Sequence, residues 1–79
     1  MNSIVKQLVV EHVYITDIDN PIIKKGTKVL LKYIFNFPTT GKVFITLQDL
    51  ENFNIDKRGN PEAIITTLEY KVGFLLEIL

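Results

Sequence analysis

The sequence has no cysteine and no tryptophan, and its single histidine is His12. The absence of cysteine excludes disulfide bonds and any zinc site built on thiolates. Nucleophilic catalysis needs a nucleophile beside a base, but the only serine, Ser3, stands near the start of the chain and His12 lies within an apolar stretch. We therefore expect a protein that is not an enzyme and that uses no metal and no cofactor.

Long apolar runs are also absent, since no stretch approaches the ~18 residues that a membrane-spanning helix needs. The start of the chain, Met1–Lys6, lacks the basic region and uninterrupted apolar run of a signal peptide. We expect a cytoplasmic protein, and the absence of cysteine fits a reducing compartment. A chain of 79 residues is typical of one domain, here residues 1–79.

Acidic residues occur as two close pairs, Asp17/Asp19 and Asp49/Glu51. Both pairs stand where a turn or a helix start is expected, and aspartate often accepts hydrogen bonds from nearby backbone at such places. We therefore interpret both as structural. The segment Asp56–Glu62 starts like a calcium-binding loop but has an arginine at its third position, where an oxygen ligand is required.

Most of the chain has the residue types and the two-residue period of β-strands. Residues 4–16 are rich in valine and isoleucine and predict a long first strand. In residues 29–37 the apolar side chains Val29, Leu31, Tyr33, Phe35 and Phe37 alternate, which places them on one face. A turn at 38–41 leads into 42–47, so these two strands are expected to form a hairpin.

Turns and a short helix are expected between and after these strands. Asp17–Pro21 predicts a turn, and Gly26 is expected to have a positive φ angle in a second turn. Residues 46–53 predict one or two helical turns, because a threonine stands at the start and Leu47, Leu50 and Phe53 recur at three-residue intervals. Residues 68–78 alternate again, which indicates one long strand or two strands bent at Gly73.

Together these elements predict a mainly β fold with one short helix, either a small five-stranded barrel or a strongly bent antiparallel sheet. Residues 20–31, with Lys24-Lys25-Gly26 before an apolar run, resemble the approach to the second strand of SH3-like barrels. The family favours aspartate where this chain has Thr27, and its tryptophan has no counterpart here. The resemblance implies an SH3-like fold and assigns no binding residue.

Hydrophobic residues make up 47% of the chain, which is high for so small a domain and indicates a full core or a surface covered by a partner. Leu30 and Ile34 are expected to share a face with Lys28 and Lys32, and the C-terminal segment is apolar on both faces. We therefore expect a binding module that contacts another protein, or a second copy of itself, through these apolar side chains. The expected contact residues are Leu30, Ile34, Lys28, Lys32, Phe74 and Leu76. In the alternative, the rest of the barrel and the helical turn cover both faces.

The chain's size and its richness in isoleucine, lysine and asparagine fit a phage or mobile-element accessory protein that inhibits a host factor.

The charges sum to zero but are unevenly distributed, because residues 22–48 carry five lysines and no acid. Lysines beside exposed aromatic rings are typical of small barrels that bind nucleic acid. The residues for this alternative function are Lys24, Lys25, Lys28, Lys32, Tyr33 and Lys42. The competing interpretation places Tyr33 in the core and gives the lysines the role of keeping an edge strand soluble.

Overall fold

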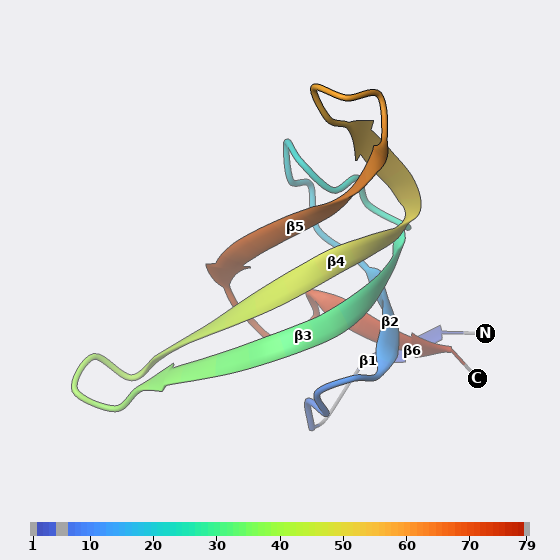
Figure 1. Cartoon of the computed structure of the whole chain (residues 1–79). Coiled ribbons are helices and arrows are strands. Elements are labelled where there is room, and N and C mark those ends of the chain that lie inside the picture. The colour runs from blue at the N-terminus through green and yellow to red at the C-terminus, as the bar shows by residue number, and fades with distance from the viewer. Residues whose placement is uncertain (1, 5–6, 79) are drawn as a thin grey trace.

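The computed structural model describes residues 2–4 and 7–78, which form one six-stranded sheet (Figure 1). The strand order is β1-β6-β2-β3-β4-β5, and every neighbouring pair is antiparallel. The strands are β1 (Asn2–Ile4), β2 (Val13–Thr16), β3 (Lys28–Phe37), β4 (Lys42–Ile55), β5 (Pro61–Glu69) and β6 (Leu75–Ile78). The predicted mainly β fold is confirmed in its form of a strongly bent antiparallel sheet.

The sheet does not close into a barrel, because β1 and β5 stand at opposite ends of the strand order. The SH3-like resemblance is accordingly not confirmed. A sixth strand arises because the predicted first strand, 4–16, is divided. Within that range β1 ends at Ile4, residues 5–6 lie outside the described residues, and β2 begins only at Val13. The break is local, since Glu11 has a φ of 68° and the Tyr14 hydroxyl accepts a 2.9 Å hydrogen bond from the Val9 N–H.

The C-terminal alternation belongs to two strands, so the prediction of a bend at Gly73 is the correct one of the two alternatives. The chain turns through residues 70–74, where Gly73 has a φ of 97°, a left-handed conformation that glycine adopts at little cost. After this turn β6 pairs with β1 and β2 rather than with β5. The apolar strand β6 is therefore paired on both sides, by β1 and by β2.

The predicted helix over 46–53 is wrong, because these residues lie within β4. A helix-start signal is nevertheless present at Asp49, whose carboxylate accepts hydrogen bonds from the backbone N–H groups of Glu51 (2.8 Å) and Asn52 (3.0 Å). These bonds hold an irregularity in the β4–β5 pairing between Gln48 and Phe53. A capping residue thus bends a strand here instead of starting a helix.

A register shift in β3 determines which side chains reach the core. Leu31 pairs with Leu47 and Tyr33 pairs with Thr46, so Lys32 is an extra residue, a β-bulge. Because neighbouring residues on β4 point to opposite faces, the bulge moves Tyr33 to the face opposite Leu31. The predicted single apolar face of β3 is therefore wrong beyond Leu31, and Ile34 takes the place on the core side.

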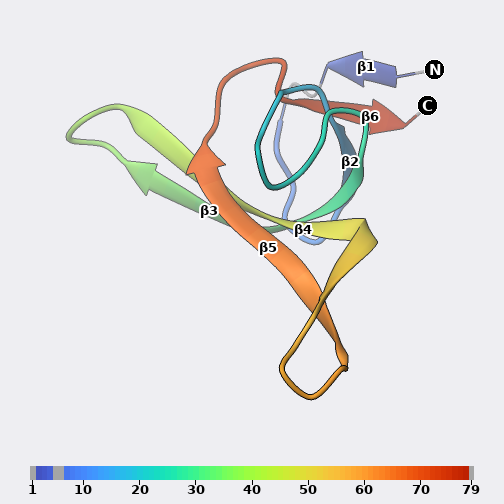
Figure 2. The same ribbon diagram turned by 90° about the horizontal axis from the view of Figure 1, so that it is seen from above.

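The core lies inside the bend of the sheet and is covered by the loop between β2 and β3. Thr16 fastens this loop, because its hydroxyl donates to the Lys24 carbonyl (2.9 Å) and accepts from the Thr27 N–H (3.2 Å). Figure 2 shows the loop folded over the inside of the sheet, where it contributes Ile23 to the core. The expected positive φ of Gly26, 87°, is found in this loop. The buried hydrophobic residues are Tyr14, Ile23, Val29, Leu31, Ile45, Leu47 and Leu75.

Candidate functional site

The outer face of the sheet, opposite the core, carries a row of aromatic side chains from β3 and β4. Tyr33, Phe35 and Phe37 are 57%, 44% and 49% exposed. The ring centroids of Tyr33 and Phe35 lie 6.1 Å apart, and those of Phe37 and Phe44 lie 5.5 Å apart in an edge-to-face arrangement. On β5, Ile65 and Thr67 extend the same face. We call this surface the aromatic face and define it by Tyr33, Phe35, Phe37, Phe44, Ile65 and Thr67.

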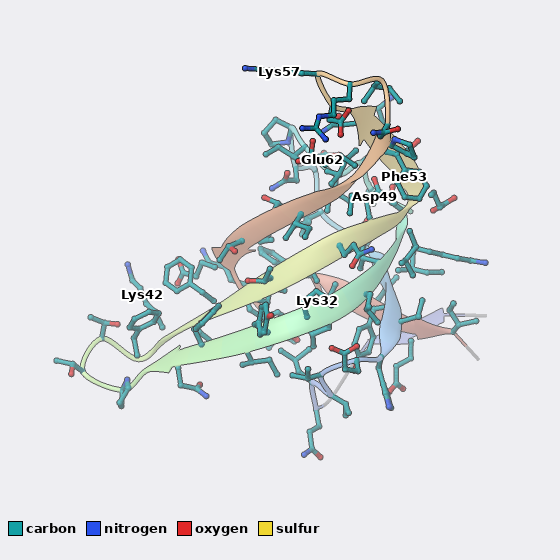
Figure 3. All side chains as sticks on the ribbon, viewed as in Figure 1. Lys32, Lys42, Asp49, Phe53, Lys57 and Glu62 are labelled. Atoms are coloured by element: carbon teal, nitrogen blue, oxygen red, sulfur yellow. The ribbon has the colours of Figure 1, made fainter. Side chains whose placement is uncertain are left out.

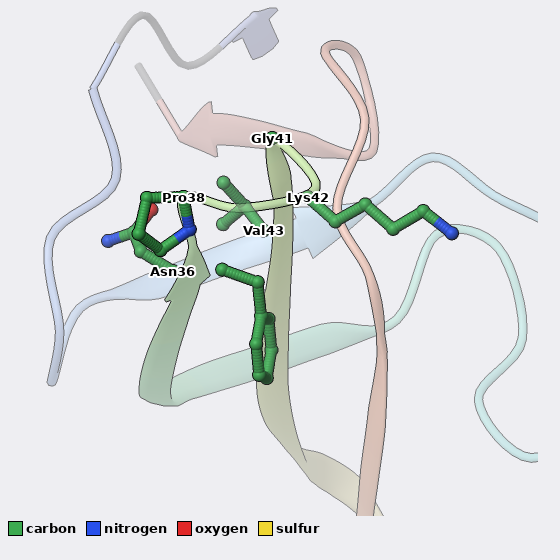
Figure 4. Close-up of a pocket in the computed structure, with 6 residues that line it drawn as sticks. Asn36, Pro38, Gly41, Lys42 and Val43 are labelled. Carbon is green, nitrogen blue, oxygen red and sulfur yellow. The ribbon is translucent and has the colours of Figure 1, made fainter.

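Two hollows are lined in part by Phe37. Phe35, Phe37, Phe44 and Thr67 line a shallow apolar depression of about 410 Å³. A second hollow, of about 270 Å³, lies at the tip of the β3–β4 hairpin (Figure 4). Its lining residues are Asn36, Phe37, Pro38, Gly41, Lys42 and Val43. Phe37 is shared by both hollows, but Asn36 and Val43 form a cross-strand pair on the opposite face from Phe35 and Phe44. Only the first hollow therefore lies wholly on the aromatic face.

The middle of the aromatic face is uncharged. Its central cross-strand row is Tyr33, Thr46 and Thr67, and the next row toward the hairpin tip is Phe35, Phe44 and Glu69. Lys42 follows at the tip, opposite Phe37. The charged side chains of these rows, Glu69 and Lys42, therefore lie toward the hairpin tip. The central row offers the Tyr33 ring and the exposed Thr67, while Thr46 is buried.

The apolar surface continues along β5 onto the far end of the β4–β5 hairpin. Phe53 pairs with Ala63 and Ile55 pairs with Pro61. Alternate residues of β5 share a face, so these pairs lie on the same side of the ladder as Ile65. Both Phe53 and Ile55 are exposed, and Figure 3 shows Phe53 beyond Asp49, where β4 changes direction.

The structure separates the residues expected to form the apolar contact patch. Leu30 is half-buried and shares its face with Lys28, but the bulge at Lys32 puts Ile34 on the opposite face, against the core. The expected common face of Leu30 and Ile34 is therefore wrong.

The two C-terminal residues of that patch also belong to the body of the fold. Phe74 packs against the core, with its ring centroid 6.2 Å from that of Tyr70. Leu76 is half-buried and pairs with Ile4 and Ile15 in the neighbouring strands. Neither is a prominent surface residue.

The lysines of the alternative site are dispersed. Lys25 lies in the β2–β3 loop beside Lys24 and forms an ion pair with Asp17, with an N–O distance of 3.5 Å. Lys28 begins β3, while Lys42 lies opposite the end of that strand, roughly 30 Å away at 3.3 Å per residue. Figure 3 shows Lys32 near the middle of the sheet and Lys42 at the hairpin. Of this set, Tyr33 belongs to the aromatic face, and Lys42 lies opposite Phe37 at the end of that face.

Among the residues that the structure describes, Tyr70 has a shifted pKa, which burial and, secondarily, the nearby Tyr14 raise above 10.0. Among residues 2–4 and 7–78, no three histidine, aspartate or glutamate side chains gather closely enough to hold a metal ion. In the same residues no helix has the length and apolar character to cross a membrane.

Sequence reasoning missed Phe37, Phe44 and Ile65 as surface residues. Their signal was visible, because Phe35 and Phe37 alternate on one strand and Phe44 stands symmetrically across the turn at 38–41. What the pattern could not supply was the position of the bulge, which decides whether these rings face the core. Comparisons of the chain with family models, curated proteins and solved structures found no significant match.

Proposed function

We propose that this chain is a non-enzymatic binding module that contacts another protein through the aromatic face. The observation that supports this most is the exposure of Tyr33, Phe35 and Phe37, each about half exposed on β3. An aromatic side chain buries roughly 150–250 Å² when covered, so these rings leave on the order of 300 Å² of apolar surface. This matches the largest patch of a typical monomer, which is often functional.

The chemistry of the face favours a protein partner. Aromatic residues are enriched and charged residues depleted at the centres of protein interfaces, and the central row here is Tyr33, Thr46 and Thr67. Large rings at the centre of an interface commonly contribute most of the binding energy. The expected cytoplasmic location and the accessory role of a phage or mobile-element protein remain part of this proposal on composition alone.

The test is affinity capture from the source lysate with nuclease present, followed by mass spectrometry. Wild type is compared with the Phe35→Ser/Phe37→Ser double variant and with Val72→Ser. Val72 is 81% exposed and lies in the turn before β6, so it is a matched loss of exposed apolar surface away from the face. We expect a partner that Val72→Ser retains and the double variant loses. A double variant that stays folded and keeps every partner would refute the proposal.

Nucleic-acid binding is the second candidate, and the exposure of Tyr33 favours it. The tilted pair of Tyr33 and Phe35, with Lys42 at the hairpin end of the same face, offers stacking surface near a cation. Binding to a single-stranded oligonucleotide should then weaken with salt, by about 0.7 log units per phosphate contact per log unit of salt. The absence of any mobility shift at low salt would remove this candidate.

A further inference from the structure

Strand β5 forms one edge of the sheet, and its hydrogen-bonding pattern can be assigned. The Tyr70 N–H donates to the Val43 carbonyl over 2.7 Å, one step beyond the last β4–β5 pair. Antiparallel pairs alternate between bonded and non-bonded, so Leu68 and Thr66 bond toward β4. The N–H and C=O groups of Ile65, Thr67 and Glu69 consequently point away from the sheet.

This edge lacks the features that usually prevent strand pairing. Natural edge strands carry lysines, bulges or internal prolines. In β5 the only proline is Pro61, at its first position, and the run from Ala63 to Leu68 is uncharged. The irregularity in the β4–β5 pairing inserts its extra residues into β4 and leaves β5 regular. Among the described residues, no backbone hydrogen bond joins the outer side of β5 to another segment.

The open edge and the aromatic face are one continuous surface. The outward-pointing backbone groups belong to Ile65, Thr67 and Glu69, and the side chains of these residues lie on the aromatic face. A strand added to β5 would therefore extend the aromatic face by one strand width. Its own side chains would then lie next to Ile65 and Thr67.

The charges of β5 indicate what kind of strand would fit. Its two charged residues, Glu62 and Glu69, are both acidic and stand seven positions apart, so their side chains lie on opposite faces. Opposite charges directly across a ladder stabilise the pair, and like charges destabilise it. The matching strand carries a lysine or arginine opposite each glutamate and β-branched or apolar residues between them.

A second copy of this chain does not have that pattern. When β5 pairs antiparallel with β5 of a second copy, residues that stand opposite each other have their side chains on the same face. The two residue numbers are then both odd or both even. Depending on register, Glu69 then faces residues such as Pro61 or Ala63, and Glu62 faces Leu68 or Tyr70. None of these is a cation, so charge complementarity favours a foreign strand.

We infer that the partner contributes an extended segment that pairs with the edge of β5 and places basic residues opposite Glu62 and Glu69. This inference rests on the proposed protein-binding function and specifies the partner's structure and charge. Strand addition is a common mode of peptide recognition, in which main-chain bonds give affinity and alternate side chains give specificity.

The experiment selects a displayed library of random dodecapeptides on the immobilised protein. We expect enriched peptides with lysine or arginine seven positions apart around a β-branched run. Synthetic protein with an N-methyl group on Ile65 should bind these peptides at least tenfold more weakly while keeping its unfolding midpoint, because that N–H points outward. N-methylation of Thr66, whose N–H bonds to β4, should instead destabilise the fold.

A charge reversal tests the specificity. The Glu62→Lys/Glu69→Lys variant should select acidic peptides in place of basic ones, whereas Glu77→Lys, an exposed site on β6, should leave the selection unchanged. No enrichment, enrichment of peptides without the paired cations, or equal binding to N-methyl-Ile65 protein would overturn the inference.

Two further outcomes separate this inference from the function on which it rests. If selected peptides bind the N-methyl-Ile65 protein but not Phe35→Ser, the aromatic face is a binding site and the strand-pairing inference is wrong. If both changes leave binding intact, both proposals fail. A self-associated species, heavier than the 9.1 kDa monomer and abolished by N-methyl-Ile65, would overturn the foreign strand in favour of a second copy.

Discussion

The side-chain hydroxyls of Thr46 on β4 and Thr67 on β5 lie 2.8 Å apart, directly across the ladder at the centre of the aromatic face. The two hydroxyls differ in their access to water. Thr46 is only 5% exposed, whereas Thr67 is an exposed residue. This single bond therefore predicts an asymmetry between two otherwise equivalent substitutions.

We expect Thr67→Val to destabilise the protein more than Thr46→Val. Removing the Thr67 hydroxyl leaves a buried hydroxyl without its partner, which costs about 1–3 kcal/mol. Removing the Thr46 hydroxyl leaves the exposed Thr67 hydroxyl, which can form a hydrogen bond with water instead, so this substitution costs about 1 kcal/mol. Urea unfolding of both variants and of the double variant checks this, and the double variant should lose less than the sum. Equal losses of unfolding free energy in the two single variants would contradict the difference in burial between the two hydroxyls.

Asp49 is expected to be the most important polar residue for stability in the β4–β5 hairpin. It is buried, and its carboxylate accepts three hydrogen bonds, two from backbone N–H groups and one from the Asn52 side-chain amide (3.1 Å). Its bonds also position Glu51, whose carboxylate accepts from the Lys28 N–H. Asp49→Ala should lower the free energy of unfolding by about 3 kcal/mol, since bonds to charged groups contribute roughly 1.5–3 kcal/mol each.

The matched control for Asp49→Ala is Asp56→Ala. Asp56 also accepts from two backbone N–H groups, those of Arg58 and Asn60, but both bonds are exposed to water. We expect a loss of only about 1 kcal/mol there. Hydrogen exchange should show that the amides of residues 53–55 exchange faster in Asp49→Ala than in wild type. Equal protection in the two proteins would contradict a role of Asp49 in holding this part of β4.

How far the sequence predicts this fold is decided by a few residues. The turn at 38–41, the positive φ of Gly26 and the division near Gly73 follow from local backbone chemistry, and all three are present. The bulge at Lys32 is different, because nothing in the residues around it distinguishes a bulge from a regular strand. That extra residue reverses the exposure of Tyr33 and Phe35, and the candidate site depends on this reversal.

The segment around Asp49 shows a second limit. Its local bonding was correctly expected to be structural, but a carboxylate that accepts from the second and third following N–H groups occurs both at helix starts and at strand irregularities. The pairing of β4 with β3 and β5 decides between them. Short-range signals identify a bend here, and only long-range pairing shows that the bend belongs to a strand.

Deleting a single residue tests the bulge directly. Without Lys32, Leu31 can still pair with Leu47 and Tyr33 with Thr46, so every side chain keeps its face. We expect the deletion variant to fold, with a melting temperature lowered by no more than about 8 °C, the equivalent of ~1 kcal/mol in a domain of this size. Thermal unfolding followed by circular dichroism measures this.

The control is deletion of Ile34, two positions further along β3. That deletion moves Phe35 opposite Ile45 and reverses the faces of all following residues of the strand, because side chains alternate. We expect a protein that does not fold cooperatively. If the two deletions are equally tolerated, the faces of β3 are not fixed by the pairing described above.

Alkaline pH should reduce stability through Tyr70. Burial, and to a smaller extent Tyr14, raises the pKa of Tyr70 in the folded protein above its ordinary value of 10.0. The unfolded chain therefore loses this proton at lower pH than the folded chain does. The stability that the neutral phenol contributes is complete below pH 10.0 and is lost as the pH rises through the folded pKa. Tyr70→Phe should show a smaller decline in unfolding free energy between pH 9 and pH 11.

The two causes of the Tyr70 shift can be separated by a second substitution. Tyr14→Phe removes the neighbouring phenol but leaves the burial of Tyr70, so the pKa of Tyr70 should fall only part of the way toward its ordinary value. The ring carbon shift of Tyr70, followed by NMR through the titration, reports this pKa without reference to stability. A return of the pKa all the way to 10.0 in Tyr14→Phe would mean that the charge of Tyr14, and not burial, is the main cause.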